Sequence, residues 1–169
     1  DDFDPPLTPL GRQQANRISK LLAKKGFDRV YVSDLTRAVE TAEAIMARQD
    51  GIPLTRTSEL REVMSYNFLS GFDPTRQVER DIVAQERKVM KGFIEKLIKK
   101  HREGEKILIV AHGNLIRCLV SLLSGKNPKR SVVIDINNTG LTVLEVWLSG
   151  GSVLRVANSL EHLRIDQVT

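Results

Sequence analysis

The spacing of apolar residues along the chain divides it into helical and strand-like segments. Four segments repeat apolar residues every three or four positions, which is typical of amphipathic helices. Thr8 followed by Pro9 indicates a helix start, because threonine is a favoured N-cap and proline is favoured at the first helical position. We predict helices over residues 9–25, 35–48, 75–102 and 114–123, with Gly26 ending the first and Asn114 capping the last.

Short apolar or β-branched runs lie between these helices and predict strands. Residues 106–111 (KILIVA) have the pattern of a strand buried on both faces. This alternation favours a three-layer α/β/α sandwich with a mostly parallel sheet and an antiparallel C-terminal edge. No linker or repeat interrupts residues 1–169, so we predict a single domain. The predicted strands are residues 29–33, 53–57, 106–111, 132–136, 141–148 and 153–157, with residues 149–152 (SGGS) as a hairpin turn.

Composition narrows the class of protein. The chain is 41% hydrophobic and 28% charged with a net charge of +5, which is typical of a globular domain. Its apolar runs are far shorter than the roughly 18 residues of a membrane span, and its first residues lack a secretory signal pattern. One cysteine, Cys118, and three histidines do not form a zinc-binding pattern. We therefore predict a cytoplasmic protein with no metal, no other cofactor and no membrane partner.

The most basic stretch runs from Lys88 to Lys106. Glutamates alternate with its lysines, and its aromatic residue, Phe93, belongs to the apolar stripe of the helix. Single-stranded nucleic acid needs exposed aromatic side chains on which bases can stack. We therefore interpret the stretch as the solvated face of an amphipathic helix and expect no nucleic-acid partner.

Candidate chemistry lies where predicted strands end, because the active site of a parallel sheet lies beyond the carboxyl ends of its strands. His112 and Gly113 follow one strand and begin a helix, whose free N–H groups attract anions. A histidine satisfied in the core, or a plain loop histidine, is the alternative. Arg37 lies in the first turn of another helix, where its charge opposes the helix dipole. A surface pair with Glu40 or Asp34 would also explain that arginine.

A third candidate is a carboxyl group that could serve as a general acid. Glu62 lies in a short segment bounded by turn-like stretches. A positioned carboxyl group can protonate a leaving oxygen. Taken alone, Glu62 is better explained as a solvated charge in a loop.

Four segments resemble, in order and spacing, motifs of the histidine phosphatase superfamily, the phosphoglycerate-mutase-like proteins. The resemblance covers nearly the whole chain. It implies that a histidine attacks phosphorus to form a phosphohistidine, which water then hydrolyses without a metal. The matching segments are residues 7–15 (LTPLGRQQA), 33–42 (SDLTRAVETA), 60–62 (LRE) and 110–117 (VAHGNLIR), and Asn137, Asn138, Asn158, His162 and Leu163 also fit.

The resemblance also implies roles for the candidate residues. Arg37 and Gly113 would hold the phosphate, His112 would stabilise the transferring phosphoryl group, and Glu62 would protonate the leaving group. The substrate would be a phosphorylated small molecule or a phosphoprotein. A phosphoglycerate mutase, which is an isomerase, and a catalytically inactive anion-binding protein remain alternatives. Residues 64–71 depart from the family pattern and suggest an open site, which favours a phosphatase because a mutase must exclude water.

One departure concerns the nucleophile. In the family this histidine belongs to an Arg-His-Gly motif on the first strand, and this sequence contains no Arg-His-Gly. Neither His101 nor His162 follows a predicted buried strand, so neither replaces it. We expect upstream residues to supply that strand, because its removal leaves unpaired backbone groups and a slot in the core.

Overall fold

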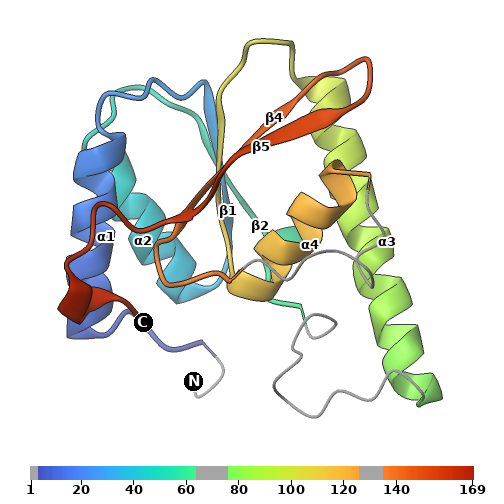
Figure 1. Ribbon diagram of the computed structural model, residues 1–169, viewed down its shortest axis with the longest axis horizontal. Coiled ribbons are helices and arrows are strands. Elements are labelled where there is room, and N and C mark those ends of the chain that lie inside the picture. The colour runs from blue at the N-terminus through green and yellow to red at the C-terminus, as the bar shows by residue number, and fades with distance from the viewer. Residues whose placement is uncertain (1–3, 64–75, 126–134) are drawn as a thin grey trace.

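The computed structural model describes residues 4–63, 76–125 and 135–169. Its helices lie on both sides of the strands, two on each side (Figure 1). This is the predicted three-layer α/β/α arrangement. None of the helices in the described ranges is long and apolar enough to cross a membrane. The helices are α1 (Pro9–Leu22) and α2 (Thr36–Met46) on one side, and α3 (Gln77–Lys100) and α4 (Gly113–Leu123) on the other.

The strands form a parallel sheet and a separate antiparallel hairpin. The parallel sheet has the order β2-β1-β3, so β1 lies at its centre. The hairpin joins β4 to β5, which pair from Leu141 opposite Ser159 to Val146 opposite Ser152. The prediction of a mostly parallel sheet with an antiparallel pair is confirmed. The strands are β1 (Arg29–Ser33), β2 (Leu54–Thr57), β3 (Ile107–Val110), β4 (Leu141–Val146) and β5 (Ser152–Ser159).

Side chains of β1 alternate between two cores, as a pleated strand requires. Val30 packs in a cluster with Ile18 of α1. Tyr31 points to the other side, where its ring meets the edge of Phe93 on α3 at a centroid distance of 5.8 Å. Because β1 is buried on both faces, its last residue, Ser33, is held in a fixed place at the carboxyl end of the sheet.

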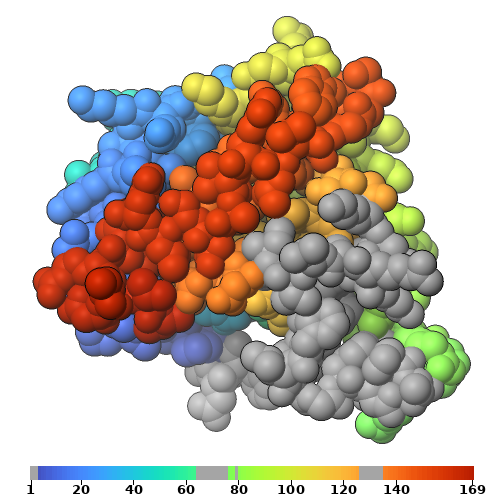
Figure 2. Space-filling view, in the orientation of Figure 1, coloured from blue at the N-terminus to red at the C-terminus, as the bar shows by residue number. Residues whose placement is uncertain are grey.

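The C-terminal part of the chain lies over the front of the molecule. Figure 2 shows the β4–β5 hairpin and the residues after it running between α1 and α4. Buried Gln14 of α1 donates from Nε2 to the backbone oxygen of Gln167 at 2.7 Å. This hydrogen bond ties the end of the chain to the first helix.

Two local signals in the sequence are confirmed. Thr8 is the N-cap of α1, and its Oγ1 accepts a hydrogen bond from the backbone N–H of Gly11 at 3.0 Å. The hairpin turn is built on Gly150 and Gly151, whose φ angles of 108° and 96° favour glycine. The backbone N–H of Gly150 closes the turn on the oxygen of Trp147 at 2.9 Å.

The prediction that Asn114 caps α4 was wrong. The helix begins one residue earlier, at Gly113, and His112 is the N-cap residue without a capping side-chain hydrogen bond. Asn114 instead accepts a hydrogen bond from Arg117 Nη1 at 2.8 Å. The reason is that Glu62, from a distant segment, accepts the backbone N–H of Leu115 at 3.1 Å and so performs the capping task.

The strand β3 is less buried than its apolar sequence predicts. Leu108 is buried, whereas Ile107, Ile109 and Val110 are half-buried. Within the described ranges β3 pairs only with β1, and β4 pairs only with β5, so each has one open edge. The predicted strand at 132–136 lies mostly outside the described residues, and its last two positions are in no strand.

The turn before β4 is held by Asn158 of β5. Asn158 accepts the backbone N–H of Asn137 at 3.0 Å and donates to the Asn137 side chain at 2.7 Å. A Cβ at Gly140 would lie 2.0 Å from Asn158 Oδ1. Such a contact is impossible without movement of Asn158, so the turn requires glycine.

We expect Gly140→Ala to lower the free energy of unfolding by about 1–3 kcal/mol, because Asn158 must release its hydrogen bonds. Gly92→Ala is the control, since an added Cβ in this helical position has no atom within 4 Å. That change should raise the free energy of unfolding by up to ~1 kcal/mol. Urea denaturation measures both, and equal midpoints for Gly140→Ala and the parent would contradict the turn's need for glycine.

Candidate active site

Polar side chains meet where β1 and β3 end. Ser33 is the last residue of β1 and is fully buried, and His112 follows β3 and is 8% exposed. His112 Nε2 lies 2.9 Å from Ser33 Oγ. This hydrogen bond joins the carboxyl ends of two neighbouring parallel strands, the edge at which the sequence predicts the site.

The electrostatic surroundings keep His112 neutral. Burial, together with the nearby positive charge of Arg37, lowers its pKa to about 4, while the charges of Asp4 and Asp34 act in the opposite direction. As pH falls, His112 therefore binds its proton at a lower pH in the folded state than in the unfolded chain. Between the ordinary value of 6.5 and about 4, protonation of the unfolded chain accordingly reduces stability.

Arg37 lies in the first turn of α2 and is half-buried. The two carboxylates that could have paired with it are taken by other arginines. Asp34 binds Arg61 through two hydrogen bonds of 2.7 and 2.8 Å, and Glu40 binds Arg12 at 3.0 Å. In the part of the chain that the structure describes, the Arg37 guanidinium has no hydrogen-bond or ion-pair partner. It is thus a free cation next to a neutral histidine.

Sequence reasoning missed Asp4. Its two carboxylate oxygens accept hydrogen bonds from the backbone N–H and the hydroxyl of Thr36, both at 2.7 Å. These hydrogen bonds from Thr36 lower the pKa of Asp4. The carboxylate therefore caps α2 and adds a negative charge near His112. No local pattern could have revealed this cap, because 32 positions separate the two residues.

Glu62 lies at the N-terminus of α4, next to the end of β3. Its Oε1 accepts the backbone N–H of Val63 at 3.0 Å as well as that of Leu115 at 3.1 Å. The side chain is exposed to solvent. The other oxygen, Oε2, has only a longer contact, with the backbone N–H of Asn114 at 3.4 Å, so it is the oxygen better placed to carry a proton to a leaving group. Gly113 begins the same helix, and a Cβ there would meet ordinary contacts at 3.9 Å, so packing does not demand glycine.

The structure thus places Arg37 at the start of α2, which follows β1, and His112 and Gly113 at the start of α4, which follows β3. Glu62 lies beside the start of α4. His101 and His162 bind elsewhere, to Tyr31 and Thr139. Within the described ranges no group of three or more histidine, cysteine or acidic residues could hold a metal ion. The arrangement can bind an anion through the free guanidinium and the neutral imidazole.

Phosphate should raise the pKa of His112, because a bound anion offsets the repulsion from Arg37. Imidazole NMR signals followed against pH should show His112 titrating near 4 without phosphate and about one unit higher, or more, with millimolar phosphate. Arg37→Gln should raise the phosphate-free value and remove the response. His162 is the internal control, since burial lowers its pKa away from Arg37. A His112 titration that phosphate leaves unchanged would disprove the shared anion site.

Similarity to known proteins extends along most of the chain. Residues 2–159 match the sequence model of the histidine phosphatase superfamily (branch 1). A 2,3-bisphosphoglycerate-dependent phosphoglycerate mutase from Methylorubrum extorquens is 30% identical over 158 residues, which are 79% of this chain and 74% of the relative. The mitochondrial serine/threonine-protein phosphatase PGAM5 of Rattus norvegicus is 28% identical over 98% of this chain, which spans 59% of that relative's length.

A solved structure has the same fold. It is a phosphoserine phosphatase from Entamoeba histolytica in complex with 3-phosphoglyceric acid, with a TM-score of 0.74 and 27% sequence identity. The match covers 95% of this chain and 88% of that one. Relatives named as phosphatases and relatives named as mutases are therefore both similar to this protein. The family match over nearly the whole chain agrees with the order of the motifs, and the chain belongs to the histidine phosphatase superfamily.

Proposed function

We propose that the protein is a metal-independent phosphomonoesterase that acts through a phosphohistidine. The observation that carries the proposal is the half-buried guanidinium of Arg37, which has no partner among the described residues and whose positive charge acts on the neutral imidazole of His112. A guanidinium offers forked donors that match two phosphate oxygens. A neutral imidazole carries one N–H group, which can donate a hydrogen bond to a third phosphate oxygen.

The proposed reaction has two steps. In the first, a histidine nitrogen forms a bond to phosphorus while the bond from phosphorus to the ester oxygen breaks, and Glu62 gives its proton to that oxygen. In the second, water attacks phosphorus, Glu62 takes a proton from the water, and the histidine leaves. Arg37 and His112 stabilise the charge on the phosphoryl oxygens in both steps.

His112 is not the attacking residue in this proposal. Its Nε2 is turned toward Ser33, and the resemblance assigns it the stabilising role. We propose that the attacking histidine belongs to an Arg-His-Gly segment preceding Asp1, on a strand that pairs between β3 and β4. The open edges of these two strands, and the half-buried apolar side chains of β3, support this position.

A phosphatase is favoured over a mutase because Glu62 is exposed to solvent. A mutase must keep water away from its phosphorylated intermediate, whereas a phosphatase uses that water. Residues 64–71, whose sequence also favours a phosphatase, lie outside the described residues. The names of the relatives support a phosphorylated small molecule, such as phosphoserine, or a phosphoprotein as the substrate.

In the form extended by its natural upstream residues, Glu62→Gln should reduce kcat/KM for phosphoserine by roughly 10²–10⁴-fold, the usual scale of general acid catalysis. The loss on p-nitrophenyl phosphate should be much smaller, because a nitrophenolate leaves without a proton. Glutamine keeps an oxygen that can accept the N–H of Leu115, so the cap is retained. Glu103→Gln is the control, because this exposed carboxylate lies in the connection that leads into the N-terminal end of β3. Equal losses on both substrates would limit Glu62 to a structural role.

The proposed nucleophile is tested by two forms of the protein. Residues 1–169 alone should bind phosphate but should not hydrolyse phosphoesters, whereas the form extended by its natural upstream residues should turn over substrate and trap an acid-labile phosphohistidine. Activity of residues 1–169 that is lost in His112→Ala would make His112 the nucleophile instead. Inactivity of both forms would favour the catalytically inactive anion-binding alternative.

A further inference from the structure

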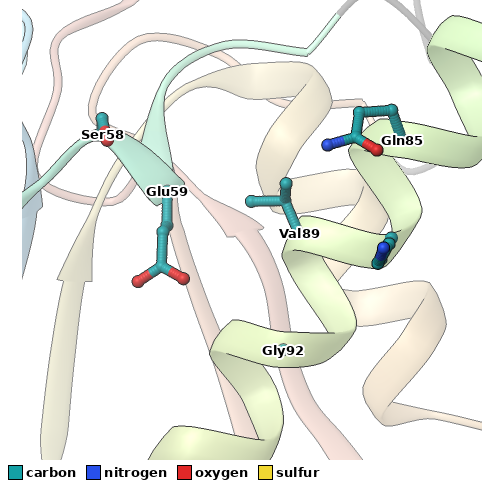
Figure 3. Close-up of a pocket in the computed structure, with 6 residues that line it drawn as sticks. Ser58, Glu59, Gln85, Val89 and Gly92 are labelled. Atoms are coloured by element: carbon teal, nitrogen blue, oxygen red, sulfur yellow. The ribbon is translucent and has the colours of Figure 1, made fainter.

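Away from the candidate active site, a groove separates α3 from β2 and the short 3₁₀ helix η1 (Ser58–Leu60) that follows it. It consists of two adjoining hollows of about 430 and 370 Å³. Glu59 lines both hollows, so they form one groove, which we call the α3–β2 groove. Figure 3 shows the first hollow, with Ser58 and Glu59 on one wall and Gln85, Val89 and Gly92 on the other.

One stripe of α3 lines the groove from end to end. Its members recur every three or four residues, so they share one face of the helix. Gly92 lies in the middle of this stripe, and an added Cβ there would have no atom within 4 Å. The surface is therefore open at this point, which leaves room for a ligand. The stripe includes Gln85, Lys88, Gly92, Lys96 and Lys100.

The charge of the groove is predominantly positive. Among the described residues that line it, the carboxylate is that of Glu59, and the cations are those of Arg56, Lys88, Lys96 and Lys100. Glu59 binds Lys96 at 2.7 Å, and this ion pair bridges the two walls. Lys96 is 68% exposed, and ion pairs so exposed to water contribute little, so an incoming carboxylate can displace Glu59 easily. Lys88 has no ion-pair partner in the ranges that the structure describes.

The second wall offers hydrogen bonds of the main chain. In the described sheet β2 is an edge strand, paired with β1 on one side only. Thr55 and Thr57 of this strand line the groove. An open edge can accept a further strand, and a neighbouring helix can supply side-chain contacts to it.

We propose that the α3–β2 groove binds an extended acidic segment of a partner protein. The segment pairs its backbone with the open edge of β2 and places its carboxylates at Lys88, Lys96 and Lys100. The twelve-residue helical distance from Lys88 to Lys100 is about 18 Å. This distance corresponds to about five or six extended residues.

A peptide fits the groove better than a nucleic acid does. The aromatic residues that line it, Tyr31 and Phe93, are 5% and 3% exposed, so their rings are not available for stacking bases. The groove also ends at η1, and Arg61 and Glu62 follow η1 directly. None of the candidate active-site residues lines either hollow, so the proposed binding does not depend on catalysis.

The probe is a fluorescein-labelled octapeptide of alternating glutamate and valine, and its binding is followed by fluorescence anisotropy. We expect binding that weakens with rising salt and is absent for the matching lysine–valine peptide. Methylation of alternate backbone nitrogens, which removes N–H donors and keeps the charge, should weaken binding by about tenfold or more.

Two variants locate the binding. Gly92→Leu should weaken binding by about tenfold or more, because the side chain fills the groove, while leucine favours the helix over glycine. Lys88→Glu with Lys100→Glu should have a similar effect. Lys91→Glu with Lys99→Glu is the matched control, since it makes the same charge change on exposed positions of α3 outside the groove and should alter affinity by only about twofold.

Several results would overturn the proposal. Equal losses for the two charge-reversed pairs would mean that the peptide binds to the general charge of α3. An oligothymidylate of similar length that binds as tightly as the peptide would identify a polyanion surface. Concentration-dependent dimerisation that Gly92→Leu removes, without any peptide binding, would assign the groove to a second copy of the chain.

Discussion

The parallel pairing of β1 with β3 is the interaction on which the candidate site depends. It sets Val32 opposite Val110, so Ser33 and His112 emerge at the same edge of the sheet. The Ser33–His112 hydrogen bond then joins the two strand ends. Because β1 is buried by helices on both faces, a shift of register would disturb two cores as well as the site. The stability of the fold and the position of the imidazole therefore have the same cause.

Competition among charges decides which cation is free for a ligand. Arg61 and Arg12 pair with Asp34 and Glu40, the carboxylates that are close to Arg37 in the sequence. The positive charge of Arg37 instead helps to lower the pKa of Asp4. Asp4, the other acid near His112, is engaged in capping α2. The result is a positive charge at a helix N-terminus, where the helix dipole disfavours it and an anion would relieve it. The negative charge of a bound phosphate group would offset this unfavourable electrostatic interaction.

The helix α3 faces two environments that need different side chains. Its buried residues Met90 and Phe93 pack against Tyr31 and the side chains of α4. Three of its lysines line the α3–β2 groove, where Glu59 is the carboxylate among the described lining residues. The basic stretch therefore has a solvated face, as its sequence predicts, and part of that face is a groove with a definite shape.

Local patterns in the sequence were sufficient to predict the order of helices and strands, the Thr8 cap, the glycine hairpin and the place of Arg37 and His112. These features depend on neighbouring residues and on the general rule that parallel strands end together. Only the tertiary structure decided that Glu62 rather than Asn114 caps α4, that Asp4 caps α2, and that Arg37 finds no partner in the described part of the chain. Each of these depends on groups that are brought within about 3 Å of each other across long stretches of chain, and no local spacing records such contacts.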